Sequence, residues 1–192
     1  MKPVVPVARA CLAASLCLLG ACKPPPSDEA LTRVTPEAAP TFASDPLPSP
    51  DTEGATWVDS GRANSDDGER IVYGIPGEAA LLALECVRDG TQPPMLRITR
   101  FAQADEGAGA MMALIGNGHM GRLPVDAEDV SGRLAWEGMH RASEDFWEPL
   151  AGPRSLAATV PGAGRVSINP SPLPGELIDA CRKPLSVDAP DP

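Results

Sequence analysis

The sequence predicts a mainly β domain, an antiparallel sandwich or small barrel with one or two short helices. Apolar and polar residues alternate along about seven short runs, and turn residues separate the runs roughly every 8–12 positions. Asn117-Gly118, a dipeptide typical of tight hairpins, stands between two of the runs. Because the runs lie between Thr56 and Pro184, we expect one globular domain over residues 56–184.

Four strands are expected in the first half of this domain. They cover residues 56–58, 71–73, 82–86 and 95–101. The Pro76-Gly77 step ends the second strand in a turn. In the third strand Leu84 and Cys86 lie on the same face, so Cys86 is expected to point inward.

A hairpin with a two-residue turn is expected at Asn117-Gly118. This turn sets the register between strands at 111–115 and 119–125. The expected pairs are Gly116 with His119, Ile115 with Met120, Leu114 with Gly121, and Met112 with Leu123.

The last part of the domain should add a strand at 130–136, a short helix, a second hairpin and a final helix. Ser143 is a candidate cap for the short helix, which Pro149 limits to about Leu150. The second hairpin turns at 161–164. Pro174 can open the final helix, which carries Leu177, Ile178 and Cys181 at helical spacing.

Residues 1–21 have the pattern of a signal peptide, with basic Lys2 and Arg9 before an apolar run of about a dozen residues. A helix that spans a bilayer needs about 20 apolar residues, so this run is too short to be one. The tetrapeptide Leu19-Gly20-Ala21-Cys22 resembles the lipobox of bacterial lipoproteins. That resemblance implies that Cys22 is diacylated and becomes the first residue of the mature protein. The alternative is an ordinary signal peptide cleaved nearby, with Cys22 free or paired.

Two segments outside the domain have the composition of disordered chain. Residues 22–55 are rich in proline and show no periodicity, which predicts an extended tether of about 3.1 Å per residue where it is polyproline-like. The tail at 185–192 is expected to be frayed.

The cysteines outside the signal peptide and the lipobox form one pair. In an exported protein, Cys86 and Cys181 are expected to form a disulfide, with two buried free thiols as the alternative. Closing a loop of about 95 residues would stabilise the fold by roughly 4–5 kcal/mol on chain-entropy estimates.

The net charge argues against nucleic acid as a partner. The chain carries −10, and removal of the signal peptide leaves 14 Lys and Arg against 26 Asp and Glu, or about −12. Affinity for nucleic acid comes largely from Lys and Arg that neutralise phosphates, and these are in deficit here. The expected partners are the bilayer, through acylated Cys22, and a protein or a cell-wall component.

Residues 71–182 loosely resemble a group of small exported proteins from alphaproteobacteria. The shared features are Tyr73-Gly74-Ile75-Pro76-Gly77, Leu84-Glu85-Cys86, Leu96-Arg97-Ile98-Thr99-Arg100, Val160-Pro161-Gly162 and Ala180-Cys181-Arg182. The resemblance implies an exported β-rich domain and no particular activity.

Catalytic signatures are absent from the sequence. It holds no Gly-x-Ser-x-Gly elbow, no HExxH motif and no phosphate-binding glycine loop. The adjacent acids Glu144 and Asp145 diverge on a helix and are typical of a first helical turn. We therefore expect no catalytic residues and no cofactor, with a hydrolase of envelope material as the alternative.

Residues that could bind copper, sugars or calcium also have structural interpretations. Soft donors in two clusters suggest a copper carrier, but the expected hairpin register puts Met112 and Met120 on opposite faces, so no metal site is expected. The donors are Met111, Met112, His119, Met120, Met139 and His140.

Three tryptophans could stack on sugars: Trp57, Trp136 and Trp147. Because the chain has so few aromatic residues, positions in the core are favoured for them. The acidic turn at 64–69 lacks the ligand spacing of a calcium loop.

The expected function is that of a non-enzymatic binding or structural module on a lipid anchor in a bacterial envelope, facing the periplasm. In enterobacteria, aspartate after the acylated cysteine retains lipoproteins at the inner membrane. Lys23 stands at that position here, which by analogy favours the outer membrane.

Overall fold

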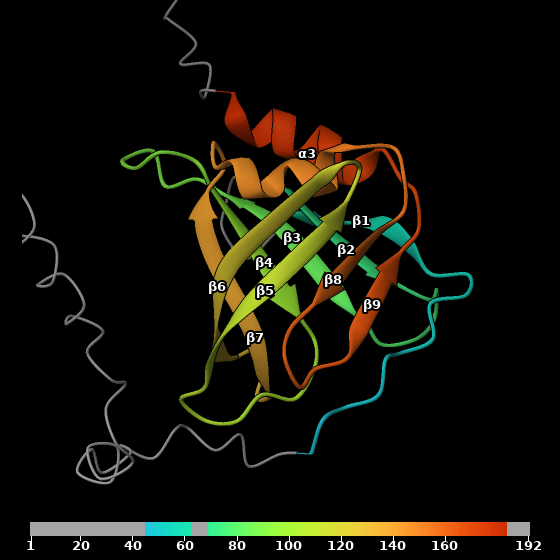
Figure 1. Cartoon of the computed structure of the whole chain (residues 1–192). Coiled ribbons are helices and arrows are strands. Elements are labelled where there is room, and N and C mark those ends of the chain that lie inside the picture. The colour runs from blue at the N-terminus through green and yellow to red at the C-terminus, as the bar shows by residue number, and fades with distance from the viewer. Residues whose placement is uncertain (1–44, 63–68, 184–192) are drawn as a thin grey trace, which may run out of the picture. The chain divides into compact units, whose positions relative to one another are not determined.

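The computed structural model of the chain describes residues 45–62 and 69–183 (Figure 1). Several predicted features lie outside the described residues. They are the signal peptide, Cys22, the tether as far as residue 44, residues 63–68 of the acidic turn and the tail at 185–192. Among the described residues, no helix combines the length and the apolar character that crossing a bilayer requires.

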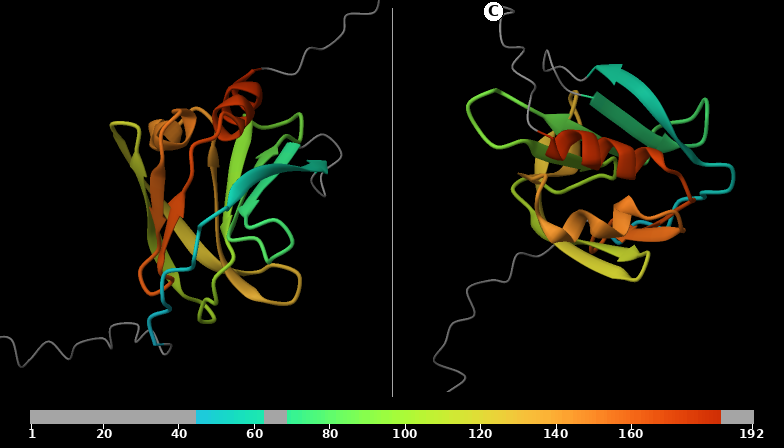
Figure 2. Two further views of the ribbon diagram at one scale, coloured as in Figure 1. Left: turned by 90° about the vertical axis from the view of Figure 1, so that its right-hand side faces the viewer. Right: turned by 90° about the horizontal axis from the view of Figure 1, so that it is seen from above.

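The described residues form one nine-stranded antiparallel sheet that curls until it nearly closes into a barrel (Figures 1 and 2). The strands are β1 (Thr56–Arg62), β2 (Glu69–Gly74), β3 (Leu82–Val87), β4 (Met95–Arg100), β5 (Gly109–Gly116), β6 (His119–Asp129), β7 (Leu134–Arg141), β8 (Leu156–Thr159) and β9 (Arg165–Ile168). Their order in the sheet is β1-β2-β3-β4-β7-β6-β5-β8-β9. The predicted mainly β fold is confirmed, and β1 and β9 are the two edges of the sheet.

The hairpin at Asn117-Gly118 has the predicted register. Every expected pair is present between β5 and β6, from Gly116 with His119 to Met112 with Leu123. Asn117 and Gly118 have φ angles of 54° and 83°. Positive φ at both central residues defines the turn that matches the twist of paired strands, and this explains why the dipeptide fixed the register.

The strand expected at 130–136 was wrong in its position. β6 continues to Asp129, and β7 begins at Leu134. Ser131 and Gly132 form a second two-residue turn with φ angles of 56° and 81°, closed by a bond from the Val130 N–H to the Arg133 carbonyl at 2.8 Å. The Asp129 carboxylate also accepts a bond from the Gly132 N–H at 2.7 Å.

The helical segments are short and lie at one end of the barrel (Figure 2). A 3₁₀ turn, η1 (Asp145–Trp147), leads into α2 (Glu148–Ala151), and α3 (Leu173–Arg182) follows β9. Ser143 is not the cap: Glu144 occupies that position and makes no side-chain capping bond. The backbone of η1 packs directly on β6, where a Cβ on Gly121 would lie 2.0 Å from the Phe146 oxygen.

The chain from Leu47 to Ala55 belongs to the folded domain, although it was expected to be part of the tether. The Leu47 N–H donates to the Gly162 carbonyl at 2.8 Å, and the Ser49 hydroxyl accepts from the Arg165 N–H at 3.1 Å. Figure 2 shows this segment running beside β9 before it enters β1. The segment therefore partly fills the opening between the two edge strands.

The core lies inside the curled sheet and is closed at both ends. Trp57 and Trp136 are 3 % exposed and Trp147 is fully buried, so the core interpretation of the three tryptophans is confirmed. At one end α2 and α3 cover the opening, and the predicted Cys86–Cys181 disulfide joins α3 to β3 with a Cα–Cα distance of 5.6 Å.

Buried Arg100 helps to close the opposite end. Its guanidinium donates to the Leu81 carbonyl at 3.2 Å and to the Ala163 carbonyl at 2.9 Å. These two bonds tie the segment before β3 and the turn after β8 to the end of β4.

Candidate binding groove

The donors proposed for copper do not converge. Met112 is fully buried in the core, whereas Met111, Met120 and Met139 are about half exposed. The His140 ring is fixed by a 2.8 Å bond between Nε2 and the Pro124 carbonyl and by an edge contact with Phe146. Within the described ranges, no group of three or more His, Cys, Asp or Glu side chains is placed to hold a metal ion.

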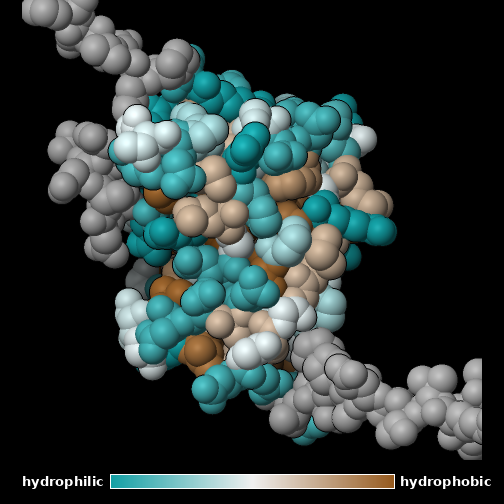
Figure 3. Space-filling view, turned by 90° about the vertical axis from the view of Figure 1, so that its left-hand side faces the viewer, coloured by the Kyte–Doolittle hydropathy of each residue, from teal (hydrophilic) through white to brown (hydrophobic). Residues whose placement is uncertain are grey.

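The other proposed residues also lie apart from any hollow. Glu144 and Asp145 are exposed at the start of η1, and the three tryptophans are buried. Figure 3 shows the face that carries β6 and β7, where apolar residues are scattered in small spots among hydrophilic ones. The described residues on that face therefore form no continuous apolar surface.

A hollow lies between α3 and the ribbon formed by β1 and β2. It has a volume of about 450 Å³. Its lining residues are Asp59, Gly61, Glu69, Ile71, Leu173, Glu176, Leu177 and Ala180. We call it the α3 groove. Its volume is within the range of about 300–1,000 Å³ that ligand pockets usually have.

The strand register explains why one wall of the α3 groove changes from apolar to acidic. Trp57 pairs with Tyr73, and Asp59 pairs with Ile71, so all four side chains lie on the core side of the ribbon. Trp57, Tyr73 and Ile71 are buried, but Asp59 is exposed. The β1–β2 ribbon therefore extends beyond the core. At its far end the side chains on the core-facing side are carboxylates, since apolar side chains there would be exposed to water.

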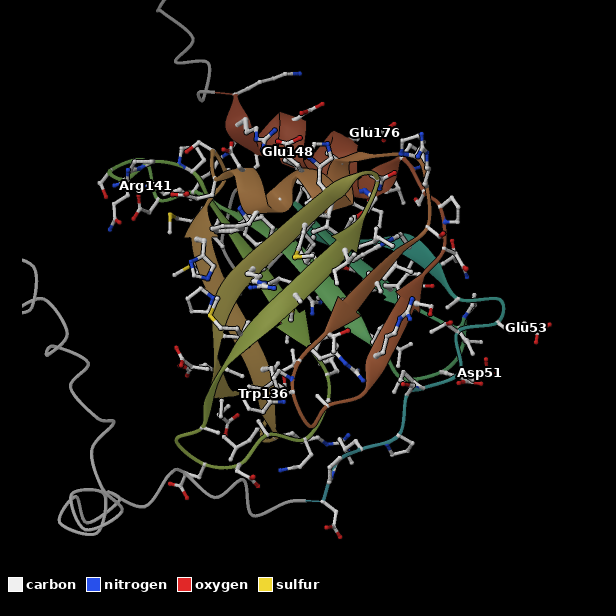
Figure 4. The ribbon with its side chains drawn as sticks, viewed as in Figure 1. Asp51, Glu53, Trp136, Arg141, Glu148 and Glu176 are labelled. Atoms are coloured by element: carbon white, nitrogen blue, oxygen red, sulfur yellow. A yellow bond between two sulfur atoms is a disulfide. The ribbon has the colours of Figure 1, made fainter. Side chains whose placement is uncertain are left out.

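The opposite wall is one side of α3. Leu173, Leu177 and Ala180 follow the i, i+4, i+7 spacing that aligns side chains along a helix. Leu177 is buried, Leu173 and Ala180 are partly buried, and exposed Glu176 lies beside them. Figure 4 shows Glu176 at the same end of the molecule as Glu148 and Arg141.

Several bonds hold α3 in place, so this wall is rigidly positioned. Besides the disulfide, Arg88 donates to the Ala180 carbonyl, and Arg182 Nε donates to the Ala142 carbonyl at 2.8 Å. Arg182 also pairs with Glu148 at 2.8 Å.

The charge of the α3 groove is negative. One oxygen of Asp59 accepts from the Gly61 N–H at 2.7 Å, and neither Glu69 nor Glu176 makes an ion pair with a described side chain. The nearby cation Arg70 pairs across the strands with Glu85, at 3.9 Å, on the outer face of the sheet. The groove thus combines an apolar floor with a rim of carboxylates.

Two smaller hollows are also lined by described residues. One of about 210 Å³ lies beside Asn117 and His119. Two of its polar side chains already have partners: Asn117 bonds to the Pro149 carbonyl and the Arg154 N–H, both at 2.8 Å, and Glu148 pairs with Arg182. The other, about 310 Å³, lies at the opposite end of the barrel around Phe101, Leu134 and Ala135.

Sequence reasoning missed the α3 groove because its residues come from three separate elements. Asp59 and Glu69 stand next to a polar turn, and Glu176 is the acid of a first helical turn. The available signal was the alternation along the first strand, which places Asp59 on the same face as Trp57.

The fold and the groove define a disulfide-linked β-barrel domain with a ligand-sized hollow at its helical end. No family model, curated protein or solved structure matches the chain. Its function is therefore argued from its own residues.

Proposed function

We propose that the chain is a membrane-anchored lipoprotein of a bacterial envelope, a non-enzymatic module that faces the periplasm and binds a protein partner through the α3 groove. The observation that carries the binding role is the α3 groove itself. It has apolar side chains at its base, it lies between α3 and the β1–β2 ribbon, and no described residue fills it. A hollow that combines apolar lining with a few polar groups is the usual first candidate for a binding site.

The anchor is supported by the sequence. The lipobox at Leu19-Gly20-Ala21-Cys22 follows a basic start and a short apolar run. Two or more acyl chains hold a protein to a membrane stably, whereas one chain does so only marginally. Lys23 follows the acylated cysteine, where enterobacterial lipoproteins of the inner membrane carry aspartate, and this favours the outer membrane.

Two experiments test the two parts of this proposal. Metabolic labelling with a palmitate analogue should mark the wild-type chain but not the Cys22→Ser variant, which should appear as soluble or unprocessed protein. An unlabelled wild-type chain would refute the anchor.

For the binding role, a photoreactive amino acid is placed at groove residue Ala180 and, as a control, at exposed Met111 on the outer wall of β5. In intact cells the first position should yield a discrete cross-linked species that the second does not. Identical patterns from both positions would refute the groove as the contact site.

A further inference from the structure

We infer that the α3 groove receives a cationic extended protein segment that places a Lys or Arg side chain among Asp59, Glu69 and Glu176. This inference rests on the proposed binding role and specifies the chemistry of the partner. An apolar side chain next to the cation would lie on the floor formed by Ile71, Leu173 and Leu177.

The charges around the groove carry the argument. Asp59 comes from β1, Glu69 from β2 and Glu176 from α3, so three elements bring carboxylates to one rim. Arg62 stands opposite Glu69 in the β1–β2 register, whereas the other arginines nearby are engaged elsewhere: Arg70 with Glu85, Arg88 with the Ala180 carbonyl and Arg182 with Glu148. Asp59 stands opposite Ile71 in the same register, and Glu176 makes no ion pair with a described side chain, so a cation from a partner would be held chiefly by these two carboxylates.

The same charges disfavour the other occupants. Phosphate groups of nucleic acids and anionic lipids would be repelled by the rim. A second copy of this acidic chain, at −10 over its full length, is a poor source of a basic segment. A small polyamine would satisfy the carboxylates but would leave the apolar floor exposed to water.

An extended segment suits this place because β1, which supplies Asp59 and Gly61 to the groove, is an edge strand. Among the described strands β1 pairs only with β2, so its outer edge keeps backbone groups that an added chain can bond. Recognition by strand addition takes affinity from such backbone bonds and specificity from pockets for alternate side chains.

The test uses the mature chain with Cys22→Ser and three dye-labelled peptides of eight residues. One alternates valine with lysine, the second valine with glutamate, and the third serine with lysine. We expect the valine–lysine peptide to bind, and the other two to bind at least about tenfold more weakly, because each lacks one of the two features the groove recognises. Affinity for the first should fall by about tenfold between 50 and 500 mM salt, since screening weakens exposed charge pairs.

A matched pair of variants assigns the binding to the groove. Asp59→Asn with Glu176→Gln removes two rim charges and keeps an oxygen that can accept the Gly61 N–H. It should weaken the valine–lysine peptide at least about tenfold and flatten the salt dependence. Glu53→Gln with Glu106→Gln makes the same change of charge on exposed loops and should leave affinity unchanged.

Absence of binding at 1 mM peptide, equal loss in both double variants, or competition by spermidine as strong as by the valine–lysine peptide would each overturn the inference. Failure here is distinguishable from failure of the binding role. A cellular cross-link at Ala180 to a partner without a basic segment would retain the binding role and refute only the cationic ligand.

Discussion

The hydroxyl of Tyr73 on β2 accepts a hydrogen bond from the backbone N–H of Asn169 at 3.0 Å and donates one to the Ser167 carbonyl at 2.9 Å. These residues lie at opposite ends of the sheet order, because β2 is next to one edge strand and Ser167 belongs to the other. The Asn169 side chain continues the connection by donating to the carbonyls of Thr52 and Ala55. The barrel is thus closed by one phenol and one amide in place of a continuous strand ladder.

Tyr73→Phe should lower the free energy of unfolding by about 1–2 kcal/mol, because it leaves two partly buried backbone groups without their partner while it keeps the ring in the core. Urea denaturation measures this difference. Ser60→Ala, which removes an exposed bond to the Arg70 carbonyl at 2.9 Å, is the control and should change stability by less than about 0.5 kcal/mol. Equal losses in both variants would contradict the closing role of Tyr73.

The same hydroxyl should make stability depend on alkaline pH. Burial raises the pKa of Tyr73, and the bond from the Asn169 N–H opposes this with a smaller lowering. Because the folded pKa exceeds the unfolded value of about 10, the contribution is fully present below about pH 10 and is lost as pH rises through the folded pKa. Urea titrations between pH 8 and 11 should show wild type losing more stability than Tyr73→Phe, and parallel curves would refute this coupling.

Arg100→Lys should destabilise the end of the barrel opposite α3. The guanidinium is 5 % exposed and bonds to two carbonyls, and burial lowers the pKa of Arg100. A lysine ammonium lacks the planar fork that reaches both carbonyls, so we expect a loss of about 1–3 kcal/mol in urea denaturation. Arg165→Lys on the exposed side of β9 is the matched control, and an equal effect there would refute the role of Arg100.

Removal of the disulfide should destabilise the domain without changing its fold. Replacing both Cys86 and Cys181 by alanine should lower the free energy of unfolding by about 2–5 kcal/mol, because the unfolded chain regains the freedom that the cross-link removes. Far-ultraviolet circular dichroism should remain that of the wild type, since Arg88 and Arg182 still hold α3. Alkylation of unreduced wild-type protein should find no free thiol at these positions, and two reactive thiols would contradict the structure.

Local sequence predicted the elements whose geometry depends on near neighbours. The β5–β6 register followed from Asn117-Gly118 because only two residues with positive φ are needed to set it. The Ser131-Gly132 turn has the same backbone geometry but was not predicted, since serine seldom adopts positive φ. The position of β7 was therefore wrong by several residues.

Some contacts between residues far apart in the sequence could be predicted, and others could not. The cysteine count predicted the Cys86–Cys181 bond, because an even pair in an oxidising compartment leaves one pairing. The bonds of residues 47–55 to β9 could not be predicted, because they join positions more than a hundred residues apart through backbone groups and small side chains.

Alternation, turn dipeptides and the cysteine pair by themselves determined that this chain is a disulfide-linked β domain, because each depends on residues close in sequence or on a rare residue type. Only the tertiary structure decided that the sheet curls into a barrel and that α3 lies over the extended end of the β1–β2 ribbon. Alternation along the first strand indicates only the face on which Asp59 lies, whereas the curl and the groove result from how distant surfaces pack once the core has formed.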